Sequence, residues 1–130
     1  MPEQIKNSVL RWQFLWKLLL LAGYAWFRGI RFNVYSMYRT AEQQNMKYRV
    51  GRTLPGSIQT NCDGYEKRSM HQRWRAADII VLAKDGSYVW KHVPEYDVLG
   101  KHWERLGGTY GGRWFIEGKT RFDDCYHLEF

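Results

Sequence analysis

The chain contains little cysteine and little proline, with 2 Cys and 3 Pro in 130 residues. Two cysteines, Cys62 and Cys125, are too few for a scaffold held together by disulfides. A reducing compartment is therefore the default expectation, and a single bridge between the two remains open. The low proline content and the lack of any biased run exclude a fibrous or low-complexity protein. No apolar run reaches the roughly 20 residues that a membrane-spanning helix needs.

Acidic residues are also scarce relative to basic ones. There are 13 Asp and Glu against 20 Lys and Arg, which gives a formal net charge of +7. This excess favours an anionic partner, such as nucleic acid, an anionic lipid surface or an anionic wall polymer. Aromatic residues are abundant at 17% of the chain, and hydrophobic residues make up 45%. A chain of this length and composition is expected to form a single domain over residues 1–130 and not to be disordered.

The most apolar stretch runs from Phe14 to Phe27. It is interrupted by Lys17 and bounded by Arg11 and Arg28, and bulky aromatic residues stand where a secretory signal would have small ones. We therefore predict a buried helix of the domain and no membrane anchor. In this helix, we expect Leu18–Leu21 to be mostly buried against a sheet.

Hydrophobic periodicity and turn signals predict helices and strands in no regular order. We predict helices from Asn7 or Ser8 to Arg28, from Thr40 (a capping box) to Gly51, and from Tyr96 to Leu106. We predict strands at Ile30–Tyr35, Ala76–Leu82, Ser87–Trp90 after an Asp85-Gly86 turn, Trp114–Phe115 after a glycine-rich loop, and Tyr126–Phe130. Residues 53–68 are predicted to form a long loop. This mixture is typical of an α+β fold, a small antiparallel sheet with packed helices.

Three residues form a candidate metal site: His71, Asp78 and His127. Two imidazoles and a carboxylate commonly hold a catalytic zinc ion and leave a fourth position for water. Zinc lowers the pKa of that water to about 7. The spacing of these residues in the sequence is also compatible with a structural role for each of them. His92 and His102 stand in polar, exposed-looking segments, and we interpret them as structural.

One segment carries a specific resemblance. It reads Ser69-x-His71-x-x-x-Arg75-Ala76-x-Asp78. It resembles the S-x-H-x-x-G-R-A-x-D segment of the zinc D-alanyl-D-alanine carboxypeptidase family, which includes phage endolysins that act as L-alanyl-D-glutamate peptidases.

Other segments resemble the same family, and they follow one another in the family order. The C-terminal residues 124–129 are similar to its carboxylate-x-x-His segment, which is followed by an apolar residue and Glu. Residues 38–44 are similar to its Y-R-[ST]-x-x-x-Q segment. Residues 51–56 and 103–114 are similar to the short phage-type members. Together the segments cover the chain from Tyr38 to Phe130.

The resemblance implies a hedgehog/D,D-peptidase-like fold with a zinc site at the sheet. It implies that His71, Asp78 and His127 bind zinc and that Asp124 is the general base. It also implies that Arg39 binds substrate and stabilises the developing oxyanion, a suitable task for a fixed cation. A structural salt bridge at the end of its strand is the alternative role for Arg39.

The function implied by the resemblance is that of a zinc metallopeptidase, an endolysin of a phage or prophage. Its partner would be the peptidoglycan stem peptide, cut at L-Ala-D-Glu or, as the second candidate, at D-Ala-D-Ala. We expect a monomer without stable membrane insertion, held in the bacterial cytoplasm until it is released to the cell wall. A basic, aromatic-rich domain that binds nucleic acid is the alternative, but the basic residues are scattered and form no stripe. A membrane-anchored protein is a third alternative.

The chain departs from the family pattern at two positions. Trp74 occupies the usual glycine position, which predicts a narrower pocket or a tryptophan that stacks on substrate. Asp124 stands where the dipeptidases of the family carry Glu, as in the endolysin branch. Residues three apart in a flat strand face opposite sides, so Asp124 can share a site with His127 only if it lies at a bend before the strand.

Overall fold

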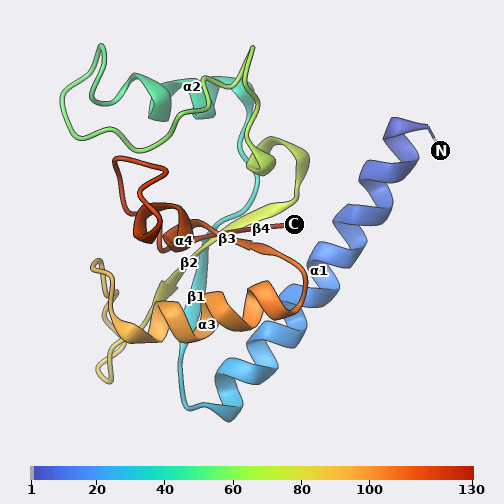
Figure 1. The fold of residues 1–130 in the computed structure, drawn as a ribbon, viewed down its shortest axis with the longest axis vertical. Coiled ribbons are helices and arrows are strands. Elements are labelled where there is room, and N and C mark those ends of the chain that lie inside the picture. Colours follow the sequence, from blue (N-terminus) through green and yellow to red (C-terminus); the bar gives the residue numbers. More distant parts are fainter. Residues whose placement is uncertain (1) are drawn as a thin grey trace.

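The computed structural model describes residues 2–130, which form a four-stranded antiparallel sheet with helices packed on it (Figure 1). The strands lie in the order β1-β2-β4-β3, and each neighbouring pair is antiparallel. In chain order the elements are α1 (Glu3–Phe27), β1 (Phe32–Ser36), α2 (Ala41–Arg49), the 3-10 helix η1 (Met70–Arg73), β2 (Ala76–Val81), α3 (Pro94–Arg105), β3 (Thr109–Tyr110), α4 (Gly111–Ile116) and β4 (His127–Glu129). The α+β class predicted from the sequence is confirmed.

The strand β2 separates the hydrophobic core from the opposite face of the sheet. All six of its residues are buried. Ala77, Ile79 and Val81 belong to the core, together with side chains of α1 and α3. Because successive side chains of a strand point to opposite faces, the residues between them, including Asp78, face the other side. A polar residue can therefore stand inside this otherwise apolar run without entering the core.

The first helix is longer than predicted and less deeply buried. It begins at Glu3, and Gly29 follows its end with a left-handed φ of 71°, as expected for a helix terminator. Leu21 is buried and Leu18 is half-buried, but Leu19 and Leu20 are exposed. The prediction that Leu18–Leu21 are mostly buried is therefore wrong. Consecutive helical residues point in directions about 100° apart, so one packed face cannot cover four in a row.

Among residues 2–130, no helix combines the length and the hydropathy required to cross a bilayer.

The capping box at the start of α2 is present as predicted. The Thr40 hydroxyl accepts a hydrogen bond from the Gln43 N–H at 3.1 Å, and the Gln43 side chain accepts one from the Thr40 N–H at 2.9 Å. These bonds satisfy backbone donors that a helix start would otherwise leave unpaired. The long loop predicted between α2 and η1 is also present and runs beside α2 (Figure 1).

The region around β3 differs from the prediction. Trp114 and Phe115 lie in α4, not in a strand, and the preceding glycine segment contains β3. Gly111 and Gly112 begin α4 where the chain is crowded. A Cβ on Gly111 would lie 2.5 Å from the Asp124 carbonyl oxygen, and one on Gly112 would lie 2.4 Å from the Tyr110 hydroxyl. These glycines permit close packing, which a sequence pattern does not distinguish from a flexible loop.

The turn at Asp85-Gly86 is confirmed, but its second arm is not a regular strand. The Ala83 N–H donates to the Ser87 carbonyl at 2.9 Å, and Leu82 and Tyr88 form an isolated bridge. The two cysteines are free thiols.

Candidate functional site

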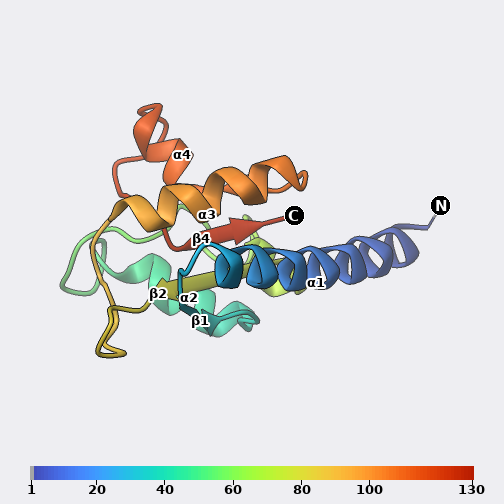
Figure 2. The ribbon, with the colours of Figure 1, turned by 90° about the horizontal axis from the view of Figure 1, so that it is seen from below.

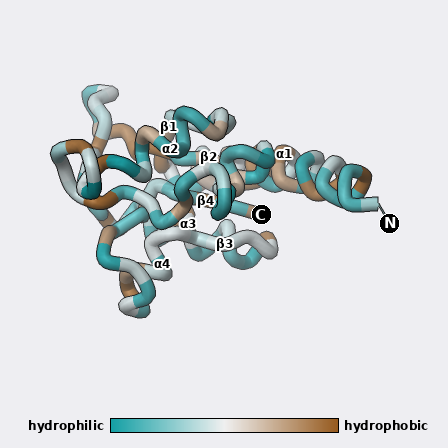
Figure 3. Tube along the Cα trace, turned by 90° about the horizontal axis from the view of Figure 1, so that it is seen from above, coloured by the Kyte–Doolittle hydropathy of each residue, from teal (hydrophilic) through white to brown (hydrophobic). Residues whose placement is uncertain are grey.

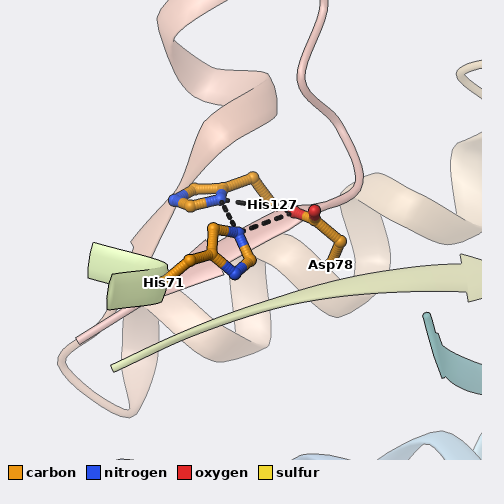
Figure 4. Close-up of side chains that lie close together, drawn as sticks. All are labelled: His71, Asp78 and His127. Atoms are coloured by element: carbon orange, nitrogen blue, oxygen red, sulfur yellow. Dashed lines mark hydrogen bonds and ion pairs between the residues drawn. The ribbon is translucent and has the colours of Figure 1, made fainter. Parts of the chain in front are cut away.

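Three side chains from β2, β4 and η1 converge on one point of the sheet face opposite the core (Figure 4). Asp78 and His127 are directly opposite each other in the β2–β4 register, which places their side chains on the same face. His71 reaches them from η1, just before β2. The structure thus brings together the residues that the sequence proposed as a metal site.

The three facing atoms form a nearly equilateral triangle. His71 Nε2 lies 3.3 Å from Asp78 Oδ1 and 3.2 Å from His127 Nδ1. His127 Nδ1 lies 3.4 Å from Asp78 Oδ1. Zinc contacts nitrogen and oxygen ligands at about 2.0–2.1 Å, and tetrahedral geometry then separates the ligand atoms by roughly 3.3–3.4 Å. Two imidazoles and a carboxylate at these separations fit zinc.

His71 is fixed by bonds that leave one ring nitrogen facing the site. The Ser69 hydroxyl caps η1 by accepting a hydrogen bond from the His71 N–H at 3.2 Å. The ring Nδ1 lies 2.6 Å from the Met37 carbonyl oxygen, to which it donates. Nε2 therefore carries the lone pair that points toward Asp78 and His127. Burial outweighs the neighbouring Asp78 carboxylate and lowers the pKa of His71, which favours this neutral form.

His127 is oriented by a carboxylate on the same strand. Its Nε2 lies 2.8 Å from Glu129 Oε1, and the ring donates to that oxygen, which leaves Nδ1 for the site. A carboxylate in this position fixes a ligand histidine and increases its basicity. Burial opposes protonation of His127, but the bonds to Asp78 and Glu129 prevail and raise its pKa to about 10. A metal ion and a proton would compete for the lone pair of Nδ1.

Asp78 divides its two oxygens between the histidines and Arg39. Oδ1 faces the two rings, while Oδ2 accepts a hydrogen bond from the Arg39 guanidinium. Arg39 also donates to Gln44 Oε1 at 3.0 Å. Burial alone would raise the pKa of Asp78, but its bonds to His127 and His71 hold it well below the usual value. Arg39 thus makes the salt bridge considered as its alternative role, and it also lines the cleft.

Asp124 lies at the bend that the sequence required. It precedes β4, and its carbonyl accepts a hydrogen bond from the His127 N–H at 3.0 Å, which closes a turn. Gly111 packs directly against this turn. The Asp124 side chain lines the same cleft as the metal-site residues. Burial raises the pKa of its carboxyl to about 6, and the Asp78 carboxylate adds to this effect. A carboxyl group with this pKa can accept a proton near neutral pH.

The cleft over the three residues has a volume of about 360 Å³. The charged part of its wall comprises four cationic side chains, Arg39, Lys47, Lys67 and Arg68, and three carboxylates, Asp78, Asp124 and Glu129. Burial and the neighbouring Arg39 lower the pKa of Lys47. A second hollow of about 380 Å³ shares Lys47, Asp78 and Asp124 with the cleft and extends it toward Trp90 and Tyr126. Together the two hollows give room for an extended ligand.

Trp74 adopts the backbone conformation for which the family pattern has glycine. Its φ is 58°, and it is the one non-glycine residue with positive φ among residues 2–130. Its ring stacks on Tyr38 at a centroid distance of 4.7 Å and does not line the cleft. Trp74 therefore does not narrow this cleft, and its stacking on substrate stays a prediction. The stacking with Tyr38 offsets part of the cost of a left-handed tryptophan.

His92 lies in a polar cluster beside the site and is not exposed as the sequence suggested. Its Nδ1 lies 2.6 Å from Asp123 Oδ2, and its Nε2 lies 2.7 Å from Asp97 Oδ1. The Asp97 carboxylate also accepts a hydrogen bond from the Tyr110 hydroxyl. Burial opposes protonation, but the bonds to the two carboxylates prevail and raise the pKa of His92. The ring thereby ties the start of α3 to the turn that carries Asp124. His102, by contrast, has a structural role, since it stacks on Tyr24 at 3.7 Å.

Four groups that shape the site were not among the predicted site residues: the Met37 carbonyl, Lys47, His92, which was interpreted as structural, and Glu129. Of these, Glu129 had a detectable signal, because residues two apart in a strand share a face and it follows His127 by two. The other three depend on contacts between distant segments, for which the sequence carried no signal.

Known proteins resemble the chain in sequence and in fold. No family model matches the chain. Among curated proteins, it is similar to the peptidoglycan L-alanyl-D-glutamate endopeptidase CwlK of Bacillus subtilis (strain 168), with 33% identity over 110 residues that cover 78% of this chain and 62% of the relative. The chain therefore spans less than two thirds of the length of that relative.

Two solved structures share the fold. The L,D-carboxypeptidase DacB from Streptococcus pneumoniae matches with a TM-score of 0.63 and 20% identity, over 91% of this chain and 64% of that one. The L-Ala D-Glu endopeptidase ChiX of Serratia marcescens matches with a TM-score of 0.50 and 18% identity, over 77% of this chain and 66% of that one.

Proposed function

Since the chain is related to the family of D-alanyl-D-alanine carboxypeptidases and L-alanyl-D-glutamate peptidases, we propose that it is a zinc-dependent peptidase of the peptidoglycan stem peptide. The observation that carries this proposal is the triangle of His71, Asp78 and His127, whose separations suit a tetrahedral zinc ion. The L-Ala-D-Glu bond is the favoured target, because CwlK is named for that activity. The D-Ala-D-Ala bond is the second candidate.

His71, Asp78 and His127 would hold the metal, and the cleft leaves room for water and substrate beside them. When bound, zinc supplies Lewis-acid polarisation of the scissile carbonyl and lowers the pKa of water. The chain itself supplies the proton transfers. Asp124 would accept the proton of the attacking water and return it to the leaving amine, so that it ends the cycle ionised, as it began.

Arg39 has two tasks in this proposal. Its bond to Asp78 Oδ2 keeps Oδ1 facing the histidines, and its charge lies on the cleft wall, where negative charge develops on the substrate carbonyl oxygen. Lys47, Lys67 and Arg68 also line the cleft. The stem peptide carries free carboxylates, with which Lys67 and Arg68 would pair.

We also propose that the protein serves as an endolysin of a phage or prophage, which reaches the cell wall once another agent has opened the membrane. The net charge of +7 favours adsorption to an anionic wall.

The deciding experiment combines metal analysis with the identification of products. We expect about one zinc per purified chain, and we expect mass spectrometry of digested peptidoglycan to show fragments cut within the stem peptide. His71→Ala and His127→Ala should lose both the zinc and the cleavage. A protein that contains no zinc and cleaves in the presence of a chelator would contradict the proposal.

A further inference from the structure

The helix α1 has two apolar faces, and the packing of the domain covers only one of them. The covered face contains Phe14, Leu21 and Ala25, which are buried. On the opposite side, apolar residues recur at spacings of three and four, which places them in one stripe along the helix. The exposed stripe consists of Ile5, Val9, Trp12, Trp16, Leu19, Leu20, Trp26 and Phe27.

This exposed stripe is large and strongly exposed. Trp12 is 71% exposed, Leu19 67% and Trp26 84%. At a rise of about 1.5 Å per residue, the stripe extends for about 33 Å. Gly23 lies within it with nothing within 4 Å of its Cβ position, so no other part of the domain covers the stripe at that point. An apolar patch of this extent on a water-soluble surface is typical of an interaction site.

The N-terminal half of α1 also projects beyond the sheet, as Figures 1 and 2 show. In Figure 3 hydrophobic positions, drawn in brown, recur along this projecting part. Here the stripe is accessible without obstruction by the rest of the domain.

Basic side chains border the stripe along one flank. Lys6, Lys17 and Arg28 are spaced by eleven residues, or three helical turns, and therefore line one flank. The one acidic residue in α1 is Glu3.

From this combination we infer that α1 binds an anionic phospholipid surface, lying in the membrane plane with the exposed stripe in the interface. Three tryptophans and a phenylalanine suit the interfacial region, where their rings bury apolar surface beside the headgroups. The flanking cations complement anionic headgroups, and attraction of this kind adds to the apolar term. The opposite face remains packed on the domain, so the helix lies on the bilayer and does not traverse it. Such docking would hold the cleft close to the membrane, beside the wall.

The test is co-sedimentation of the full chain with lipid vesicles. We expect binding to vesicles that mix phosphatidylglycerol with phosphatidylcholine, weaker binding to phosphatidylcholine alone, and a loss of binding as salt is added. The double variant Trp12→Gln/Trp16→Gln should weaken binding about tenfold or more, because both rings leave water on binding. Tyr65→Gln, which changes an aromatic residue that is 61% exposed in the long loop, is the matched control and should bind like the parent.

A second variant and a second readout make the test decisive. Leu19→Glu places a negative charge in the middle of the stripe and should weaken binding at least as much. Both stripe variants should retain the parent's cleavage of isolated, lipid-free peptidoglycan, which separates failure of this inference from failure of the proposed function. Equal binding by parent and double variant would overturn the inference. So would a parent that ignores anionic vesicles but forms a dimer lost in the double variant, because the stripe would then contact a second copy of the chain.

Discussion

At the scale of the residue, each proposed metal ligand uses one polar atom for orientation and presents the other to the site. His71 gives Nδ1 to the Met37 carbonyl, His127 gives Nε2 to Glu129, and Asp78 gives Oδ2 to Arg39. The remaining atoms, Nε2, Nδ1 and Oδ1, then face one another. Orientation by partners beyond the ligands themselves is what turns three nearby side chains into a metal site.

The first prediction separates a base from a ligand. Asp124→Asn keeps the shape of the side chain but cannot accept the proton, so turnover should fall by about 10²–10⁴-fold. Zinc content and folding should stay near normal, because the three ligand residues are unchanged. Metal analysis, thermal unfolding and kcat measure these three properties.

Asp123→Asn is the control for this prediction. Its carboxylate bonds to His92 and is not part of the metal triangle, so we expect a much milder loss of turnover. If Asp123→Asn were inactive while Asp124→Asn retained activity, the turn before β4 would present the other carboxylate and the base assignment would be wrong.

A second prediction concerns Glu129. Glu129→Gln keeps the size of the side chain but removes the charge that orients His127, and we expect zinc affinity to fall by about 10–100-fold with the fold intact. Competition with a chelator of known affinity measures the change. Glu117→Gln, which alters an exposed carboxylate paired with Lys119, should leave the affinity unchanged. Equal affinities for all three proteins would show that Glu129 does not support the ligand.

At the scale of the element, strand register creates the site. The pairing of β2 with β4 places Asp78 opposite His127, and a shift of one residue would move one of them to the core side of the sheet. The short turn from Asp124 to His127 and the glycine packed against it fix where β4 begins. The core-facing side chains of β2 and the buried face of α1 stabilise this register, because a shift of one residue would remove the β2 side chains from the hydrophobic core.

The third prediction tests the packed face of α1. Leu21 is fully buried, so Leu21→Ala should lower the free energy of unfolding by about 2–5 kcal/mol. Leu19, two residues earlier, is exposed, and Leu19→Ala should change it by only about 0.5 kcal/mol. Denaturant unfolding of both variants provides the comparison. Similar losses for both would mean that the exposed stripe is covered in solution.

At the scale of the whole molecule, His92 joins parts of the chain that are distant in sequence. Its ring bridges Asp97 at the start of α3 and Asp123 in the turn before β4, and Tyr110 of β3 bonds to the same Asp97 oxygen. These contacts link the helical layer to the turn that carries the proposed base. The position of Asp124 thus depends on tertiary packing well outside the cleft.

The fourth prediction concerns the pH dependence of this link. The folded pKa of His92 is raised above its ordinary value of 6.5, so its contribution to stability is fully present below about pH 6.5 and is lost as the pH rises through the folded pKa. His92→Gln should therefore destabilise the protein more at pH 6 than at pH 9. Urea unfolding of parent and variant at both pH values measures the difference. A larger effect at pH 9 would show that the ring is neutral in the folded protein.

The sequence by itself determined which residues form the candidate site, and it determined most of the elements. Local signals predicted these elements: the capping box at Thr40, the apolar run of β2 and the helical spacing of apolar residues in α3. Such signals depend only on hydrogen bonds and side-chain periodicity within one segment, so they can be recognised in the sequence. The segments that resemble the family identified His71, Asp78 and His127, because such segments are defined by the residue types that the chemistry needs. It also required Asp124 to precede the last strand.

The tertiary structure alone decided which atoms of those residues face one another and how the remaining surface is used. The partners of the ligands, Met37 and Arg39 among them, come from segments more than 30 residues away from His71 or Asp78, and no local pattern records such a contact. In α1, too, the sequence does not distinguish the two faces, because both carry apolar residues. Only the tertiary structure shows that one face is buried and the other exposed, because the burial of a residue depends on which other residues pack against it.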